Sequence, residues 1–269
     1  MPETDREHDA GADLALLREA AREAGRIAMR YFRRSPEVWL KDGHSPVSEA
    51  DLAVDRYLKD VLLDARPGYG WISEETVDER APAPRRRVFV VDPIDGTRAY
   101  IAGQDQWCVS LAVVEDGRPV AGVLECPARE EFIEARRGLG ATQNGVAIHA
   151  KLPPEGEALV IGSVRGMADA LPEVWRERMT VAPHVPSLAY RIAMVARGDL
   201  AGTFVRPNSH DWDLAAADLV LEEAGGAVLA AGGRPLVYGG PTFRHGALVA
   251  ASGSLLDTML NIVAAGRLG

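Results

Sequence analysis

Apolar residues recur every three or four positions near the start of the chain and predict a long amphipathic helix over residues 9–34. The residues of this stripe are Leu14, Leu17, Ala21, Ala24, Ala28 and Tyr31. Ser35-Pro36 should end the helix, and residues 1–8 are expected to form a frayed tail. A second helix is predicted over about 48–64, before Pro67-Gly68.

Shorter apolar runs in the next part of the chain predict a sheet. The β-branched run 88–92 is typical of a buried strand. Residues 107–115 and 118–125 predict two further strands, joined by Asp116-Gly117 as a hairpin turn. Another strand is expected at 131–135. We therefore expect an antiparallel-rich sheet beside the two helices.

Residues 151–157 are polar and rich in Pro and Gly, so they predict a boundary between two subdomains. Residues 9–150 would form an N-terminal α+β subdomain, and residues 151–269 a C-terminal α/β subdomain. The second part predicts strands near 158–163, 200–205, 227–229 and 246–251, which alternate with helices near 169–179, 187–197, 211–224 and 253–265.

The charge balance narrows the range of partners. The 269 residues include 30 Lys plus Arg and 39 Asp plus Glu, which gives a formal net charge of −9. This balance disfavours nucleic-acid duplexes and anionic membranes, because both attract clustered cations. By itself it also counts against an anionic substrate.

Cysteine content and hydropathy predict a cytoplasmic protein. Only Cys108 and Cys126 occur, so a disulfide framework and a Cys-rich zinc site are not expected. The acidic N-terminal residues lack the apolar segment of a signal peptide. No run of about 18 apolar residues is present to span a membrane.

The most informative chemistry lies in the segment DPIDGT, residues 92–97, directly after the first predicted strand. Its proline should end the hydrogen-bonded pairing of the strand, because proline has no backbone N–H group, and its glycine permits a sharp turn. The carboxylates of Asp92 and Asp95, with the carbonyl of Ile94 between them, can then converge on a hard cation. The N–H groups of Gly96 and Thr97, at a helix start, suit a phosphate. Alternatively, both aspartates serve only as turn and N-cap residues.

Three more segments supply carboxylates that could join this group. Glu74 is the better ligand candidate of the pair Glu74-Glu75, although an exposed charged loop has the same pattern. Asp213 lies in the first turn of a predicted helix, where the helix dipole also favours an acid. Asp51 completes a capping box with Ser48, and a capping carboxylate can still face a site.

The ligand chemistry favours magnesium. All of these candidates are oxygen donors, and the six histidines form no paired ligand motif. Oxygen donors suit Mg²⁺, Ca²⁺ or Mn²⁺ better than Zn²⁺ or Cu²⁺, and no EF-hand spacing is present. Crowded carboxylates repel one another unless cations neutralise them.

Four motifs occur in a fixed order: SxxD at 48–51, SEE at 73–75, DPIDGT at 92–97 and WDLAA…EEAGG at 212–226. Together they closely resemble the inositol monophosphatase family of magnesium-dependent phosphomonoesterases. The resemblance covers residues 10–255. It implies a layered αβαβα sandwich of the α+β class, usually a homodimer, with two or three Mg²⁺ ions and a small phosphorylated metabolite as substrate.

The resemblance also implies roles by position. Glu74, Asp92 and the Ile94 carbonyl would hold the first metal ion, and Asp92, Asp95 and Asp213 the second. Asp51 and Thr97 would orient and deprotonate the attacking water. Glu74 would take part in catalysis as well as in metal binding. Bound cations would reverse the local field, so the net charge no longer argues against phosphate. The implied substrate contacts are Asp95, Gly96, Thr97, Ser187, Arg206 and Asp213, with Lys41, Arg98 and Arg191 as further basic candidates.

Departures from the family pattern bear on the substrate. Inositol phosphatases usually read DGTxNF, whereas this chain reads DGTRAY, and its Arg98 resembles bisphosphate nucleotidases and some histidinol phosphatases. Arg206 stands where inositol phosphatases have the acid that holds the inositol ring. The pair Ser187-Leu188 is again similar to nucleotidases.

Three arginines, Arg165, Arg191 and Arg206, could bind a second phosphate, although such residues are more often solvated. The resemblance therefore implies a 3′(2′),5′-bisphosphate nucleotidase acting on 3′-phosphoadenosine 5′-phosphate. The alternatives are an inositol-1-phosphate or histidinol-phosphate phosphatase. An alternative of another class is a catalytically silent, metal-binding regulatory homologue.

Overall fold

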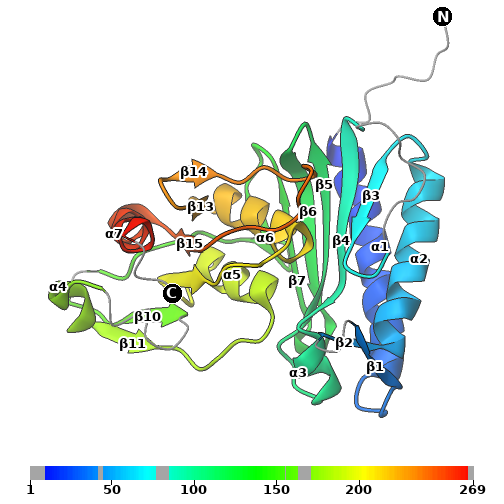
Figure 1. Cartoon of the computed structure of the whole chain (residues 1–269), viewed down its shortest axis with the longest axis horizontal. Helices are drawn as coiled ribbons and strands as arrows, with labels where there is room; N and C mark the ends of the chain where they lie inside the picture. Colours follow the sequence, from blue (N-terminus) through cyan, green and yellow to red (C-terminus); the bar gives the residue numbers. More distant parts are fainter. Residues whose placement is uncertain (1–9, 42–44, 77–84, 155, 163–170, 266–269) are drawn as a thin grey trace, which may run out of the picture.

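The computed structural model describes residues 10–41, 45–76, 85–154, 156–162 and 171–265. Across the molecule follow a helix pair, a sheet, a second helix pair, a second sheet and an outer helix layer (Figure 1). This order confirms the expected αβαβα sandwich. The expected tail 1–8 and Arg165 lie outside the described residues.

The first layer consists of helices α1 (Ala10–Tyr31) and α2 (Glu49–Ala65). The apolar stripe of α1 is buried as its periodicity predicts, with Leu17, Ala21 and Ala24 fully covered. Helix α1 ends at Tyr31 rather than at residue 34, because Arg33 and Ser35 adopt left-handed backbone angles (φ 59° and 53°) that interrupt a right-handed helix.

The first sheet has seven strands in the order β3-β4-β5-β6-β7-β8-β9. Strands β3 and β4 are parallel, and the other neighbouring pairs are antiparallel, as expected for this part of the chain. The strands are β3 (Gly70–Ser73), β4 (Arg87–Asp95), β5 (Cys108–Glu115), β6 (Arg118–Cys126), β7 (Glu131–Arg136), β8 (Ala141–Gln143) and β9 (Val146–Ala147). Both cysteines, on β5 and β6, are free and buried.

Local turn chemistry explains two features of this sheet. Asp116 and Gly117 join β5 to β6 with φ values of 48° and 81°, which suits the predicted hairpin turn. The prediction that Pro93 ends the first strand is wrong. The ladder of β4 with β5 shifts register between Asp92 and Asp95 and then resumes, so the strand bulges at the proline instead of stopping there.

Helices α5 (Leu188–Ala196) and α6 (Asp211–Glu223) lie between the two sheets (Figure 1). The second sheet has the order β11-β10-β12-β15-β13-β14, with β10 parallel to both of its neighbours. Helix α7 (Gly253–Ala264) covers its outer side. The strands are β10 (Leu159–Gly162), β11 (Met179–Val181), β12 (Gly202–Val205), β13 (Ala227–Ala230), β14 (Arg234–Pro235) and β15 (Leu248–Ala251).

The helix expected near 169–179 is wrong in extent. The part of this segment that the structure describes contains only the short helix α4 (Glu173–Arg176), which begins after Pro172. Strand β11 follows at once and pairs with β10. The β-branched residues Thr180 and Val181 favour a strand, and the open edge of β10 gives it a partner.

Several short elements complete the fold. Strands β1 (Val38–Lys41) and β2 (Ser45–Ser48) form a hairpin that sequence reasoning missed. A one-turn helix, α3 (Thr97–Ile101), follows β4, and a 3₁₀ turn, η1 (Pro127–Arg129), follows β6.

The chain passes from the first sheet to the second between Ala147 and Leu159. That 9–150 and 151–269 form separate subdomains stays a prediction. Among the described helices, none combines the length and apolar content that a bilayer crossing requires.

Candidate active site

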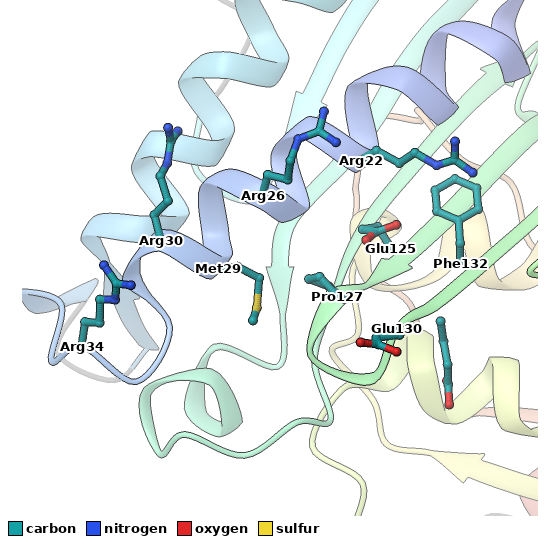
Figure 2. Close-up of a pocket in the computed structure, with 10 residues that line it drawn as sticks. Arg22, Arg26, Met29, Arg30, Arg34, Glu125, Pro127, Glu130 and Phe132 are labelled. Carbon is teal, nitrogen blue, oxygen red and sulfur yellow. The ribbon is translucent and has the colours of Figure 1, made fainter.

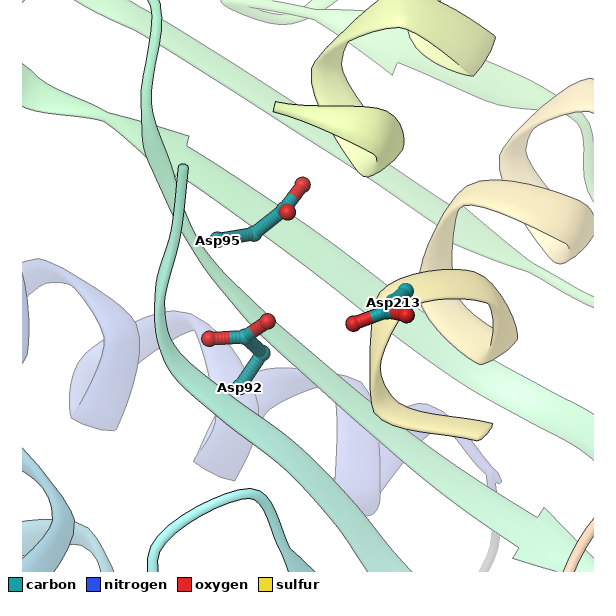
Figure 3. A group of neighbouring side chains, drawn as sticks. All are labelled: Asp92, Asp95 and Asp213. Atoms are coloured by element: carbon teal, nitrogen blue, oxygen red, sulfur yellow. The ribbon is translucent and has the colours of Figure 1, made fainter. Parts of the chain in front are cut away.

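Carboxylates from two distant parts of the chain meet beside the bulged end of β4 (Figure 3). Asp92 and Asp95 come from β4, and Asp213 comes from the first turn of α6. One carboxylate oxygen of each lies within 4.8 Å of the others. We call these three residues the aspartate trio. Asp92 and Asp95 are buried, and Asp213 is partly exposed.

The start of helix α5 holds Asp95. The hydroxyl of Ser187 donates to Oδ2 of Asp95 at 2.5 Å, and the backbone N–H of Ala189 donates to the same oxygen at 2.6 Å. The N–H of Leu188 reaches Oδ1 at 3.3 Å. The two N–H donors belong to the first turn of α5, where backbone N–H groups have no partner within the helix and favour a negative charge. The hydroxyl of Ser187 thus serves Asp95 in this structure. The expected contact between Ser187 and substrate stays a prediction.

The start of helix α6 fixes Asp213. Its Oδ2 accepts a hydrogen bond of 2.7 Å from the backbone N–H of His210, so Asp213 serves as a capping residue as well as a member of the trio. Asp211, fully buried, accepts hydrogen bonds of 2.7 Å from the N–H of Gly239 and from Nε2 of His245. These contacts tie the first turn of α6 to the segment that follows β14.

Glu74 follows strand β3 and lines the same cavity as the trio, which has a volume of about 480 Å³. It lies outside the tight group of three, but its charge contributes to the raised pKa of Asp92. The structure therefore brings Glu74 to the site at its edge. Gly96, Thr97 and Arg98 line this cavity too.

Burial and mutual repulsion change the acidity of the trio. Burial raises the pKa of Asp92 well above its ordinary value, and the charges of Glu74, Asp95 and Asp213 raise it further. Burial and the charge of Asp213 raise the pKa of Asp95 to about 7, against the hydrogen bonds from Ser187 and Ala189. A bound cation would relieve this repulsion, and the all-oxygen donor set fits Mg²⁺.

Asp51 and Thr97 form a hydrogen-bonded pair beside the trio. The hydroxyl of Thr97 lies 3.2 Å from Oδ1 of Asp51 and 3.0 Å from the carbonyl oxygen of Ile94, and its single proton serves one acceptor at a time. Oδ2 of Asp51 accepts the N–H and the hydroxyl of Ser48 at 2.9 and 2.5 Å. Asp51 therefore caps α2 and faces the site. Burial raises its pKa, although the bonds from Ser48 and Thr97 oppose the shift.

Gly96 fits a crowded turn between β4 and α3. Its φ of 96° is left-handed, and a Cβ added there would lie 3.1 Å from the carbonyl oxygen of Gln106 and 3.2 Å from Cβ of Ser187. Glycine satisfies both constraints. The turn thereby places Gly96 and Thr97 at the wall of the cavity that contains the trio.

The remaining basic candidates fall in different places. Arg191 and Arg206 line a neighbouring cavity that shares His184 and Asp213 with the first. Lys41 is the last residue of β1. His184 was missed, because it belongs to an irregular segment that gives no motif.

A separate groove is lined by Arg22, Arg26 and Arg30 of α1 and by Glu125 of β6 (Figure 2). No member of the aspartate trio lines it. This groove is therefore separate from the cavity of the trio.

Comparisons with known proteins agree with this geometry. The model of the inositol monophosphatase family matches residues 12–265. The chain is 28% identical over 232 residues to the 3′(2′),5′-bisphosphate nucleotidase CysQ of Aggregatibacter actinomycetemcomitans, a match of 82% of this chain and 85% of that protein. It is 30% identical over 253 residues to the histidinol-phosphatase of Chlorobaculum parvum, a match of 85% and 89%.

A solved structure gives the same result. The fold matches that of the Thermotoga maritima IMPase with a TM-score of 0.78 and 25% identity, over 96% of this chain and 98% of that one. The family match covers nearly the whole chain and includes all the motifs of the site. The chain therefore belongs to the inositol monophosphatase family of phosphomonoesterases.

Proposed function

We propose that this protein is a Mg²⁺-dependent phosphatase that hydrolyses a small phosphorylated metabolite with water as the nucleophile. The observation that carries this proposal is the aspartate trio beside the pair of Thr97 and Asp51. A catalytically silent homologue would have no chemical need for that pair. Family membership also favours hydrolysis of a phosphomonoester.

The residues present fit two Mg²⁺ ions. Glu74, Asp92 and the carbonyl of Ile94 would hold one, and Asp92, Asp95 and Asp213 would hold the second. A third ion, if bound, has no assigned ligand. When bound, the ions lower the pKa of a water molecule and neutralise charge on the phosphate.

Thr97 and Asp51 would direct the nucleophile. When the hydroxyl of Thr97 donates its proton to Asp51, its oxygen can accept a hydrogen bond from the attacking water. This bond orients the lone pair of the water oxygen toward phosphorus. Asp51 can then receive the proton through Thr97. The raised pKa of Asp51 brings the acidity of this carboxyl closer to neutral pH and favours that transfer.

Gly96 and Thr97 would also bind the phosphate. Both residues lie at the start of α3 and line the cavity, and their backbone N–H groups are the proposed donors. Donors placed toward the equatorial oxygens stabilise charge in the transition state. Arg98 lines the same cavity and is a candidate cation to assist them.

For the substrate we favour a 3′(2′),5′-bisphosphate nucleotide such as 3′-phosphoadenosine 5′-phosphate. Arg206 supports this choice, since it replaces the acid that inositol phosphatases use for the ring, and it lines the cavity next to the trio. The likeness to a CysQ nucleotidase agrees. Inositol 1-phosphate and histidinol phosphate are the alternatives, the second favoured by the likeness to a histidinol-phosphatase.

Phosphate release by the purified protein tests the proposal. We expect hydrolysis with Mg²⁺ and none in excess chelator, and full activity in chelator would contradict it. Comparison of kcat/KM for 3′-phosphoadenosine 5′-phosphate, inositol 1-phosphate and histidinol phosphate then ranks the substrates. Arg206→Glu should lower kcat/KM for the bisphosphate relative to the other two substrates. An unchanged order of kcat/KM values would show that Arg206 does not contribute to substrate selectivity.

We also propose an assembly and a location for the protein. Family likeness supports a homodimer, and the sequence composition supports a cytoplasmic location. The net charge of −9 supports a metabolite over a nucleic-acid duplex as partner. Sedimentation of the purified protein tests the homodimer, which a monomer at micromolar concentration would contradict.

A further inference from the structure

A second cavity adjoins the one that contains the aspartate trio. Its volume is about 770 Å³, and His184 and Asp213 line both cavities. Arg191, Arg206 and Ser209 are part of the wall of the second cavity and do not line the first. A molecule bound with its phosphate at the trio can therefore extend into this second cavity.

Two buried hydrogen-bond donors of this wall lack partners among the described residues. Nε of Arg191 and the hydroxyl of Ser209 are both shielded from solvent, and neither has an acceptor within hydrogen-bond distance. Buried polar groups are nearly always paired, so each orphan requires an explanation. Both residues line the same cavity, and a ligand there would supply acceptors to both.

The charge of the wall defines the class of ligand. The guanidinium of Arg191 stays protonated, and it donates a long hydrogen bond of 3.4 Å from Nη1 to the carbonyl oxygen of Val185. Burial lowers the pKa of Arg191, an effect that the charge of Asp95 opposes, and no acceptor among the described residues satisfies its Nε. A buried cation with an unsatisfied donor is unfavourable. Arg206 adds a second, exposed cation. Cations and an O–H donor together suit an anion, whereas a neutral polyol would gain little from two guanidinium groups.

We propose that this cavity is a second anion subsite, in which Arg191 and Ser209 bind a phosphate or carboxylate group that the substrate carries in addition to the phosphate it loses. The proposal rests on the proposed phosphatase function of the neighbouring trio. It defines the substrate class as metabolites with two anionic groups. Arg191 and Ser209 become the specificity-determining residues.

Binding without turnover tests the subsite by itself. Adenosine 5′-monophosphate retains one phosphate and is titrated by calorimetry into the protein in chelator, with adenosine as the uncharged control. We expect adenosine to bind at least about tenfold more weakly, since hydrogen bonds to charged groups carry the difference. Malonate is the carboxylate probe. Binding of either anion supports the subsite and identifies its preference, and binding of neither overturns it.

Variants of Arg191 and Ser209 test whether these two residues bind the anion. Arg191→Gln and Ser209→Ala should each weaken binding of the preferred anion by about tenfold. Arg22→Gln, in the groove along α1, should leave it unchanged. Ser209→Ala should also raise the melting temperature of the ligand-free protein, because it removes a buried unpaired hydroxyl. A purely structural role would lower that temperature and leave anion binding unchanged.

The two proposals fail in different ways. Anion binding that depends on Arg191 and Ser209, with no phosphate release in Mg²⁺, would overturn the phosphatase function and support the subsite. Normal phosphate release, with the same kcat/KM for a bisphosphate in wild type and both variants, would overturn the subsite alone.

Discussion

The hydroxyl of Ser187 donates a hydrogen bond of 2.5 Å to Oδ2 of Asp95, although the two residues are 92 positions apart. The bond joins the first turn of α5 to the bulged end of β4. The backbone N–H of Ala189 reinforces it at 2.6 Å. A carboxylate of the aspartate trio is therefore oriented by a helix that lies between the two sheets.

Ser187→Ala should weaken Mg²⁺ binding through Asp95. Groups that orient a metal ligand typically change metal affinity by about 10–100-fold. We expect the Mg²⁺ concentration for half-maximal activity to rise by that factor, with kcat recovered at saturating Mg²⁺. Ser254→Ala, at an exposed position of α7, is the control. A kcat loss that Mg²⁺ does not restore would show a different role for Ser187.

Asp213→Asn should separate metal binding from folding. The change keeps the shape but removes one of three crowded charges, so we expect the metal-free protein to melt at a higher temperature than wild type at pH 8. Mg²⁺ should then raise the melting temperature less than in wild type, because the variant binds it weakly. Activity should fall by about 100-fold or more. Asp64→Asn, exposed on α2, is the matched control, and equal Mg²⁺ shifts in both variants would exclude Asp213 as a ligand.

Features set by neighbouring residues were predictable from sequence. The stripe of α1 and the Asp116-Gly117 hairpin depend on local periodicity and turn chemistry, and both are confirmed. Strand β11 was missed because its three residues become a strand only against the edge of β10. Pro93 was misjudged for a similar reason, since a bulge in the pairing with β5 accommodates it.

The residues of the site can also be separated into those that local sequence predicts and those that depend on distant contacts. Asp92 and Asp95 stand three positions apart, so a local argument could pair them. From local sequence Asp213 was only a candidate for this group, and the family resemblance assigned it to the same metal ion, because no spacing rule connects residues so distant in sequence. The hydrogen bond from Ser187 to Asp95 and the orphan donor of Ser209 depend on packing between distant segments. No local sequence pattern predicts the hydrogen bond of Ser187 or the unpaired hydroxyl of Ser209.

Glu125 should make stability depend on pH. It lies in the groove along α1, where burial raises its pKa to about 7 from the ordinary 4.5, against the lowering effect of Arg22 and Arg26 (Figure 2). Between these two values the unfolded chain has lost the proton and the folded protein keeps it. The contribution of Glu125 to the free energy of unfolding therefore falls as pH rises from 4.5 to about 7.

Glu125→Gln removes this dependence. We expect the variant to be more stable than wild type by about 1 kcal/mol at pH 8, a value reduced for partial solvent screening, and equally stable at pH 4. Urea unfolding in chelator at both pH values measures the difference, and comparison with wild type cancels the titration of the trio. Glu130→Gln, in the same groove, is the control. An equal effect at both pH values would show that packing, and not ionisation, is responsible.

Thr97→Ala should lower kcat by about 10²–10⁴-fold, the usual contribution of a group that moves a proton in the transition state. Because the hydroxyl of Thr97 also donates to the carbonyl oxygen of Ile94, a proposed Mg²⁺ ligand, kcat is compared at saturating Mg²⁺. Thr97→Ser keeps the hydroxyl and should retain most of the activity.

Asp51→Asn completes this test, because the proposed mechanism uses the two side chains as one unit. If Thr97 passes its proton to Asp51, the double variant Thr97→Ala with Asp51→Asn should lose little more activity than the worse single variant. Single-turnover phosphate release at saturating Mg²⁺ measures all four proteins. Multiplicative losses would mean that Thr97 and Asp51 act independently, and the hydrogen bond of 3.2 Å between them would then have no part in proton transfer.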